Sequence, residues 1–180
     1  MGSLLFTDLS ARAIEQVELV KGGAPTVLAK TAGRPVGLAL DDTHAYFTDS
    51  EPGVVAKVPL AGGAVVELVK GGDKTTGIAV DATHVYWSEW GSGRIATVPK
   101  NGGAITVLAT GHKGARAITI DGERLYFTHP PSGSIRSVAK SGGPVTLHAT
   151  GQKHPYSIAV DAKAIYWADV DAGTICAVDK

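Results

Sequence analysis

The chain has 180 residues, and its 17 basic and 17 acidic side chains leave no formal net charge at neutral pH. This length favours a single domain, and the balanced charge argues against a nucleic acid or an anionic membrane as partner. The only cysteine, Cys176, excludes an internal disulfide, and no apolar run approaches the roughly 20 residues that span a bilayer.

The first residues, 1–10, lack the charged and apolar regions of a signal peptide, so the sequence leaves the compartment open. From there on the chain repeats itself with a period of forty residues and no insertion. Each copy has an Asp, then a Tyr followed by a second aromatic residue, and a Gly-Gly pair that closes the cycle. The Asp residues are Asp41, Asp81, Asp121 and Asp161, the aromatic pairs begin at Tyr46, Tyr86, Tyr126 and Tyr166, and the Gly-Gly pairs begin at Gly22, Gly62, Gly102 and Gly142. A fixed period of this length is typical of repeat architectures that include four-stranded propeller blades.

Each copy contains four short apolar, β-branched segments separated by Gly, Pro, Asp or Ser, which indicates strands rather than helices. In residues 76–110 we expect strand A at Gly77–Val80, strand B at Val85–Trp90, strand C at Arg94–Pro99 and strand D at Ala104–Ala109. The same pattern predicts strands B, C and D in residues 1–30, four strands each in 36–70, 76–110 and 116–150, and strands A, B and C in 156–180. The prediction is therefore one all-β domain over residues 1–180, with five antiparallel sheets and 18 strands.

Strand A alternates small and large residues, as in Gly77, Ile78 and Ala79, which suits an innermost strand where sheets converge on an axis. This alternation predicts a β-propeller rather than a straight stack. Because the first sheet lacks strand A and the last lacks strand D, three arrangements stay open: a five-bladed ring, an arc of a larger propeller, or completion by strand exchange. Unpaired strand edges also make self-association plausible.

The series YFTD, YWSE, YFTH and YWAD, which starts at Tyr46, Tyr86, Tyr126 and Tyr166, resembles the YWTD repeat of lipoprotein-receptor propellers. The preceding G-[IL]-A-[VL]-D segment is similar to that repeat and to the NHL repeat. The resemblance implies a protein-binding role, six blades in the receptor modules, and bacterial relatives that are exported. It also implies that the motif Asp braces neighbouring blades, a role that Asp49 and Asp169 would inherit. Glu89 and His129 depart from the motif at the equivalent position.

In an antiparallel meander the B–C and D–A connections emerge on one face, here called the loop face, and the A–B and C–D turns on the other, here called the turn face. The turn face repeats closely, and its Gly-Gly pairs suit two-residue hairpin turns with positive φ. The loop face differs between copies, and loops on a rigid scaffold are the usual place for binding. The candidate binding residues there are Arg34, Glu51, Lys74, Glu89, Trp90, Lys113, Arg116, His129, Lys153, His154 and Asp171.

A structural alternative exists for these residues: the basic D–A loops and acidic B–C loops could pair in solvent, at about 0–1 kcal/mol per pair. Trp90 is either an interface anchor or a residue packed at the rim. The histidines lack the close spacing of a zinc site, and no nucleotide or nucleophile motif has its required context, so the sequence predicts no metal and no cofactor.

The function favoured by these patterns is a non-catalytic binding or scaffold module acting through the loop face, with a protein, small-molecule or glycan ligand. One alternative is a propeller enzyme, such as a lyase or a lactonase-like hydrolase, with its site at the mouth of the central channel. His129 or His154 would be its base and Glu89 or Asp171 its partner. Another is a fragment or near-symmetric engineered propeller without a ligand.

Overall fold

The structure is a computed structural model that describes residues 2–19 and 23–180. The described chain forms 18 strands in five antiparallel sheets, and one 3-10 turn at Pro130–Ser132. Each sheet is a meander whose strands pair in chain order. The sheets are β1(Ser3–Asp8), β2(Ala13–Glu18) and β3(Thr26–Lys30); β4(Pro35–Leu40), β5(His44–Asp49), β6(Val54–Pro59) and β7(Val66–Val69); β8(Thr75–Val80), β9(His84–Glu89), β10(Ile95–Pro99) and β11(Thr106–Ala109); β12(Ile118–Asp121), β13(Arg124–His129), β14(Ser134–Ala139) and β15(Thr146–Ala149); and β16(Pro155–Val160), β17(Ala164–Asp169) and β18(Thr174–Asp179).

The fold class and the number of strands predicted from the sequence are confirmed. The first sheet lacks strand A and the last lacks strand D, as expected, while the three middle sheets have four strands. The predicted boundaries differ by one or two residues: Trp90 follows β9 rather than ending it, and β11 begins at Thr106. The Gly-Gly pair at Gly22 lies partly outside the described residues.

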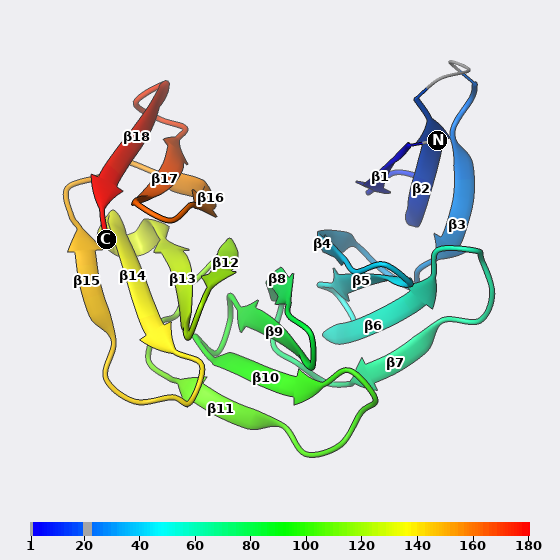
Figure 1. Cartoon of the computed structure of the whole chain (residues 1–180), viewed down its shortest axis with the longest axis horizontal. Coiled ribbons are helices and arrows are strands. Elements are labelled where there is room, and N and C mark those ends of the chain that lie inside the picture. The colour runs from blue at the N-terminus through cyan, green and yellow to red at the C-terminus, as the bar shows by residue number, and fades with distance from the viewer. Residues whose placement is uncertain (1, 20–22) are drawn as a thin grey trace.

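The five sheets fan around a common axis with β4, β8, β12 and β16 innermost (Figure 1). They form an arc, and the first and last sheets stand apart at its two ends (Figure 1). Both of these sheets keep three strands, so no terminal strand crosses over to complete the sheet at the other end. The ring is therefore not closed within this chain, and completion by a second chain stays a prediction.

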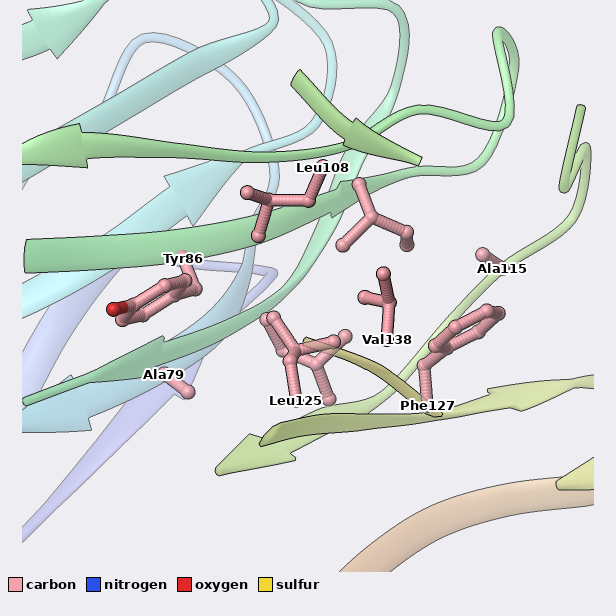
Figure 2. Close-up of a cluster of buried hydrophobic side chains, with 9 residues drawn as sticks. Ala79, Tyr86, Leu108, Ala115, Leu125, Phe127 and Val138 are labelled. Atoms are coloured by element: carbon pink, nitrogen blue, oxygen red, sulfur yellow. The ribbon is translucent and has the colours of Figure 1, made fainter. Parts of the chain in front are cut away.

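Large side chains of neighbouring sheets fill the space between them, because each sheet alone has two apolar faces. Between the third and fourth sheets, Tyr86, Ile95 and Leu108 pack against Leu125 and Phe127 (Figure 2). Equivalent clusters lie between the other pairs of sheets. Burial is thus shared between neighbours, as expected for a repeat protein.

The innermost strands approach so closely that a side chain has no room at their glycines. A Cβ on Gly37 would lie 2.4 Å from the carbonyl oxygen of Thr76 in the next sheet, and one on Gly77 would lie 2.3 Å from that of Arg116. These distances are below any real Cβ contact, so the alternation of small and large residues in strand A reflects convergence at the axis.

The third residue of the YWTD-like motif links each middle sheet to the next. Ser88 Oγ accepts the Gly77 N–H at 2.9 Å within its own sheet and donates to the Arg116 carbonyl at 2.5 Å in the following one. Thr48 and Thr128 make the same pair of bonds in their sheets. The hydroxyl therefore satisfies backbone groups of two sheets at once.

The turn face is held by ion pairs that repeat along the chain. Asp41 pairs with Lys100 at 2.8 Å, Asp81 pairs with Lys140 at 2.9 Å, and Asp121 pairs with Lys180. Lys100 and Lys140 lie in the C–D turn of the next sheet, and Lys180 follows strand C of the last sheet, so these pairs join neighbouring sheets.

The Gly-Gly pairs in the C–D turns have positive φ, as predicted, with Gly62 at 83° and Gly63 at 137°. However, the prediction of two-residue hairpins is wrong, because β6 ends at Pro59 and β7 begins only at Val66. This longer loop begins with a turn in which the Gly62 N–H donates a hydrogen bond to the Pro59 carbonyl.

Candidate functional site

The candidate site lies on the loop face, where the starts of four innermost strands converge. A cavity of about 190 Å³ opens there. Its walls are equivalent positions of four successive repeats: Val36 and Gly37, Thr76 and Gly77, Arg116 and Ala117, and Tyr156 and Ser157. Because the backbone elements converge at this point, side chains that differ between repeats come within reach of one another.

Arg116 is held between two aromatic residues at this cavity. Its guanidinium carbon lies 3.7 Å from the ring centre of Tyr156 and 5.8 Å from that of Trp90. A terminal guanidinium nitrogen also donates to the Tyr156 hydroxyl. Tyr156 remains 42% exposed, while Trp90 and Arg116 are half-buried. The three side chains therefore form a preordered cationic and aromatic group that solvent and ligands can reach.

The acidic residues predicted for this face do not neutralise that group. Glu89 is 2% exposed and pairs at 2.5 Å with Arg94 of its own sheet. Trp87 and Ser92 also donate to its carboxylate, at 3.1 and 2.6 Å. Burial would raise the pKa of Glu89, but these hydrogen bonds outweigh it and lower the pKa. Glu89 is thus a structural anion.

His129 is structural as well. It is 8% exposed, with Nε2 3.0 Å from the Lys113 carbonyl oxygen and Nδ1 2.7 Å from Ser132 Oγ. Because a carbonyl only accepts, Nε2 carries the proton and Nδ1 accepts from the serine. Burial, together with the nearby Arg136 guanidinium, lowers the pKa of His129. It has no carboxylate partner among the described residues, so the pairing of His129 as base with Glu89 as its partner is not formed.

One predicted acid–base pair is brought together. His154 Nδ1 lies 3.4 Å from Asp171 Oδ2, and both side chains are exposed, at 38% and 60%. The neighbouring Asp169 instead accepts the N–H groups of Lys153 and His154 at 2.7 and 2.8 Å. Asp169 thus holds the loop that enters its sheet, and Asp49 does the same by accepting the Gly33 N–H at 2.8 Å. These bonds fasten the loop that enters the residue's own sheet, whereas the side-chain hydroxyls that bond to the next sheet come from Thr48, Ser88 and Thr128.

Five cations of the D–A loops form no ion pair with the residues that the structure describes, whereas Lys70, at the start of one of these loops, pairs with Glu67. The expected pairing between basic D–A loops and acidic B–C loops is limited to His154 with Asp171. Glu51 and Asp73 are exposed carboxylates on the same face. In the part of the chain that the structure describes, the loop cations without an ion pair are Arg34, Lys74, Lys113, Arg116 and Lys153.

Sequence reasoning brought Trp90 and Arg116 into the candidate set but missed Tyr156. Val36, Thr76 and Arg116 occupy the equivalent position in the other repeats. An alignment of the copies at this position shows an aliphatic or small residue in two copies, an arginine in the third and a tyrosine in the fourth, although the strands beside it repeat closely.

Within residues 2–19 and 23–180 no group of three His, Cys, Asp or Glu side chains could hold a metal ion. In the same residues no helix is long and apolar enough to cross a membrane.

Comparison with family models and with curated proteins found no match for this chain. Solved structures do match. A chain in the crystal structure of a nidogen–laminin complex superposes with a TM-score of 0.87 at 23% identity, over 98% of this chain and 71% of that one. Virginiamycin B lyase from Staphylococcus aureus superposes with a TM-score of 0.84 at 18% identity, over 99% and 63%. The computationally designed Ika4 protein superposes with a TM-score of 0.70 at 11% identity, over 83% and 93%.

These likenesses establish the fold. The chain from the nidogen–laminin complex and the lyase are YWTD- and NHL-like propeller proteins, which confirms the resemblance drawn from the motifs. This chain spans less than two thirds of the length of the lyase. Because the similar structures include a protein from a binding complex and a lyase, the fold alone does not choose between binding and catalysis.

Proposed function

We propose that this chain is a non-catalytic binding module whose loop face takes an acidic segment of another protein. The observation that carries the proposal is the Arg116 guanidinium, held between Trp90 and Tyr156 at the inner cavity without a carboxylate partner among the described residues. Arginine and aromatic side chains at the centre of a surface are typical anchors of protein interfaces.

The chemistry of this group favours a carboxylate ligand. The guanidinium can donate two parallel hydrogen bonds to a carboxylate, and its stacking on Tyr156 holds it in place before binding. The cations of the surrounding D–A loops, such as Lys74 and Lys113, would draw an acidic chain toward the cavity. A chain similar to this one occurs in a nidogen–laminin complex, which supports a protein as the ligand.

The test is titration of the chain with a fluorescein-labelled oligoglutamate peptide, followed by fluorescence anisotropy. We expect saturable binding that weakens with added salt, and no binding of a length-matched oligoglutamine peptide. Arg116→Ala should weaken binding about tenfold or more. Lys163→Ala removes the same charge from the turn face and should have little effect. Equal losses in the two variants, or equal binding of both peptides, would contradict the proposal.

A lyase activity is the second candidate, favoured by the His154–Asp171 pair at 3.4 Å and by the likeness to virginiamycin B lyase. In this reading His154 is a general base and Asp171 orients its ring. Incubation with quinupristin, which is present in one of the similar lyase structures, followed by chromatography, tests it. Loss of quinupristin with the wild type but not with His154→Ala would establish the activity, and an unchanged quinupristin peak would reject it.

A further inference from the structure

A second and larger cavity, of about 530 Å³, lies between the first and second sheets, away from the inner cavity. We refer to it as the crevice cavity. Its walls come from β3, β5, β6 and β7 and from the neighbouring loops: Lys30, Thr31, Ala32, Phe47, Asp49, Pro52, Val54, Ala56, Val65, Glu67 and Lys70. The wall combines apolar side chains with the charged residues Lys30, Asp49, Glu67 and Lys70.

The repeat shows what normally fills this space. Forty residues on, the equivalent positions hold Trp87, Glu89 and Arg94. There the indole N–H donates to the Glu89 carboxylate at 3.1 Å, and the guanidinium occupies the same carboxylate. The space between the second and third sheets is therefore filled by an indole ring and by a carboxylate that accepts its N–H hydrogen bond.

The last two crevices are closed in related ways. In the fifth sheet, Trp167 donates its indole N–H to Gln152 at 2.9 Å. In the fourth sheet the ring is Phe127, and the remaining space is filled by His112, whose ring centre lies 5.2 Å from that of the phenylalanine. Arg136 completes that filling, with Nη1 2.9 Å from His112 Nδ1.

The second sheet has none of these groups. Its ring is Phe47, while Ala32 stands where the other sheets have Gly72, His112 and Gln152, and Ala56 stands where the fourth sheet has Arg136. Val54 replaces the arginine that neutralises Glu89. The crevice cavity is thus the space that an indole or a stacked cation takes in the other repeats.

An unsatisfied acceptor marks the same place. Asp49 lines the cavity and is 2% exposed, and its Oδ2 accepts the Gly33 N–H at 2.8 Å. Its other oxygen, Oδ1, is buried and has no hydrogen-bond donor among the described residues. A buried acceptor without a donor is unfavourable, so a ligand that supplies the donor recovers free energy on binding.

The surrounding charges favour a neutral donor over a cation. Lys70 pairs with Glu67 at 2.6 Å, while Lys30 lines the same cavity and donates to the Ala11 carbonyl at 3.2 Å. The four charged side chains of the lining, Lys30, Asp49, Glu67 and Lys70, sum to no net charge, so the cavity does not require a cationic ligand. We propose that the crevice cavity binds a flat heteroaromatic ring with one N–H, of the indole class, stacked on Phe47 and donating to Asp49 Oδ1.

The experiment uses two fluorinated probes that differ in the donor alone, 5-fluoroindole and 5-fluorobenzofuran, observed by ¹⁹F NMR. We expect fluoroindole to bind the wild-type chain about tenfold more tightly than fluorobenzofuran, because only the first has an N–H. N-acetyl-5-fluorotryptophanamide separates the two sources of the ring: if it binds as well as fluoroindole, the ligand is a tryptophan of a peptide, and otherwise a free indole compound.

Three variants locate the site. Asp49→Asn keeps an acceptor for Gly33 but turns an N–H₂ group toward the cavity, so the preference for fluoroindole should disappear. Ala32→Gln with Phe47→Trp rebuilds the pair of the fifth sheet and should abolish binding of both probes. Arg116→Ala, which changes the other cavity, should leave binding unchanged. Equal binding of the two probes to the wild type, or fluoroindole binding that survives the double variant, would overturn the proposal.

Discussion

Lys100 donates to Asp41 across 2.8 Å and so joins two neighbouring sheets through residues 59 positions apart in the chain. The same aspartate accepts the Tyr46 hydroxyl at 2.8 Å, and the lysine nitrogen lies 5.3 Å from the centre of that tyrosine ring. Asp81, Tyr86 and Lys140 repeat the arrangement one sheet later. The turn face is therefore a row of equivalent ties between sheets, which explains why its sequence varies so little.

The first prediction concerns this tie. Lys100→Met should lower the free energy of unfolding by about 1–3 kcal/mol, because it leaves Asp41 without its charged donor while keeping the aliphatic stem. Lys70→Met removes a pair just after the outer strand β7, where the lysine is 78% exposed, and should change stability by less than about 0.5 kcal/mol. Urea unfolding at neutral pH measures both, and equal effects would contradict the structural role of Lys100.

The same tie gives a pH dependence. Burial would raise the pKa of Asp41, but hydrogen bonds from Lys100, Thr43, Tyr46 and His44 outweigh it and hold the pKa well below its usual range. A carboxyl with a lowered folded-state pKa stabilises the fold above its unfolded pKa, near 4, and loses that contribution as the pH falls. The stability difference between wild type and Lys100→Met should therefore shrink below about pH 4. A difference that stays constant down to pH 2 would argue against it.

The second prediction concerns the hydroxyl that links neighbouring sheets. Ser88→Ala should cost about 1–3 kcal/mol, because the Gly77 N–H and the Arg116 carbonyl lose their shared partner in a buried place. Ala168 is the equivalent residue in the last sheet. Ala168→Ser should change stability by no more than about 0.5 kcal/mol, because no following sheet accepts its hydroxyl. Chemical denaturation of the two variants tests this, and a Ser88→Ala variant as stable as the wild type would be inconsistent with the link.

The third prediction concerns the two histidines, His112 and His129, near Arg136 of the fourth sheet. Burial and the nearby Arg136 lower the pKa of both His112 and His129. Since the unfolded chain then binds more protons near pH 6, stability should fall as the pH falls through about 6.5. NMR titration should show both rings changing charge at a lower pH in the folded chain than in the same chain unfolded in urea. Equal pKa values in the folded and unfolded chain would contradict the burial of the two rings beside the Arg136 guanidinium.

Much of the fold could be predicted from the sequence because the repeat provides several aligned copies of one sheet. The positions of Asp81, Tyr86 and the Gly-Gly pair at Gly102 recur without insertion, so strand order and blade type followed directly. The openness of the arc could not be predicted, because closure depends on contacts between the first and last sheets that no local pattern encodes. The length of the C–D loops was also misjudged, since Gly-Gly occurs in longer turns as well as in two-residue hairpins.

The site was predicted less well, for a physical reason. Glu89 and His129 replace the Asp of the motif, and this replacement led to the prediction that both side chains are exposed and bind a ligand. In the structure both residues fill crevices between sheets, where a change in one position is matched by changes in its neighbours, such as Arg94 and Arg136. The informative signal was therefore the joint change of several positions in one repeat, and the crevice cavity arises where that compensation is missing, at Ala32, Phe47 and Ala56.

This compensation gives the last prediction, which compares one substitution in two crevices. Phe47→Trp adds a ring where the crevice cavity lies and supplies an N–H close to Asp49, so it should raise the free energy of unfolding by about 0.5–2 kcal/mol. Phe127→Trp makes the same change where His112 and Arg136 already fill the space, and should lower it by about 1–3 kcal/mol through overpacking. Urea unfolding of both variants against the wild type gives the two signs. If both substitutions destabilise the chain to the same extent, the space beside Phe47 does not accept a larger ring, and the difference between the two crevices is not the one that the structure shows.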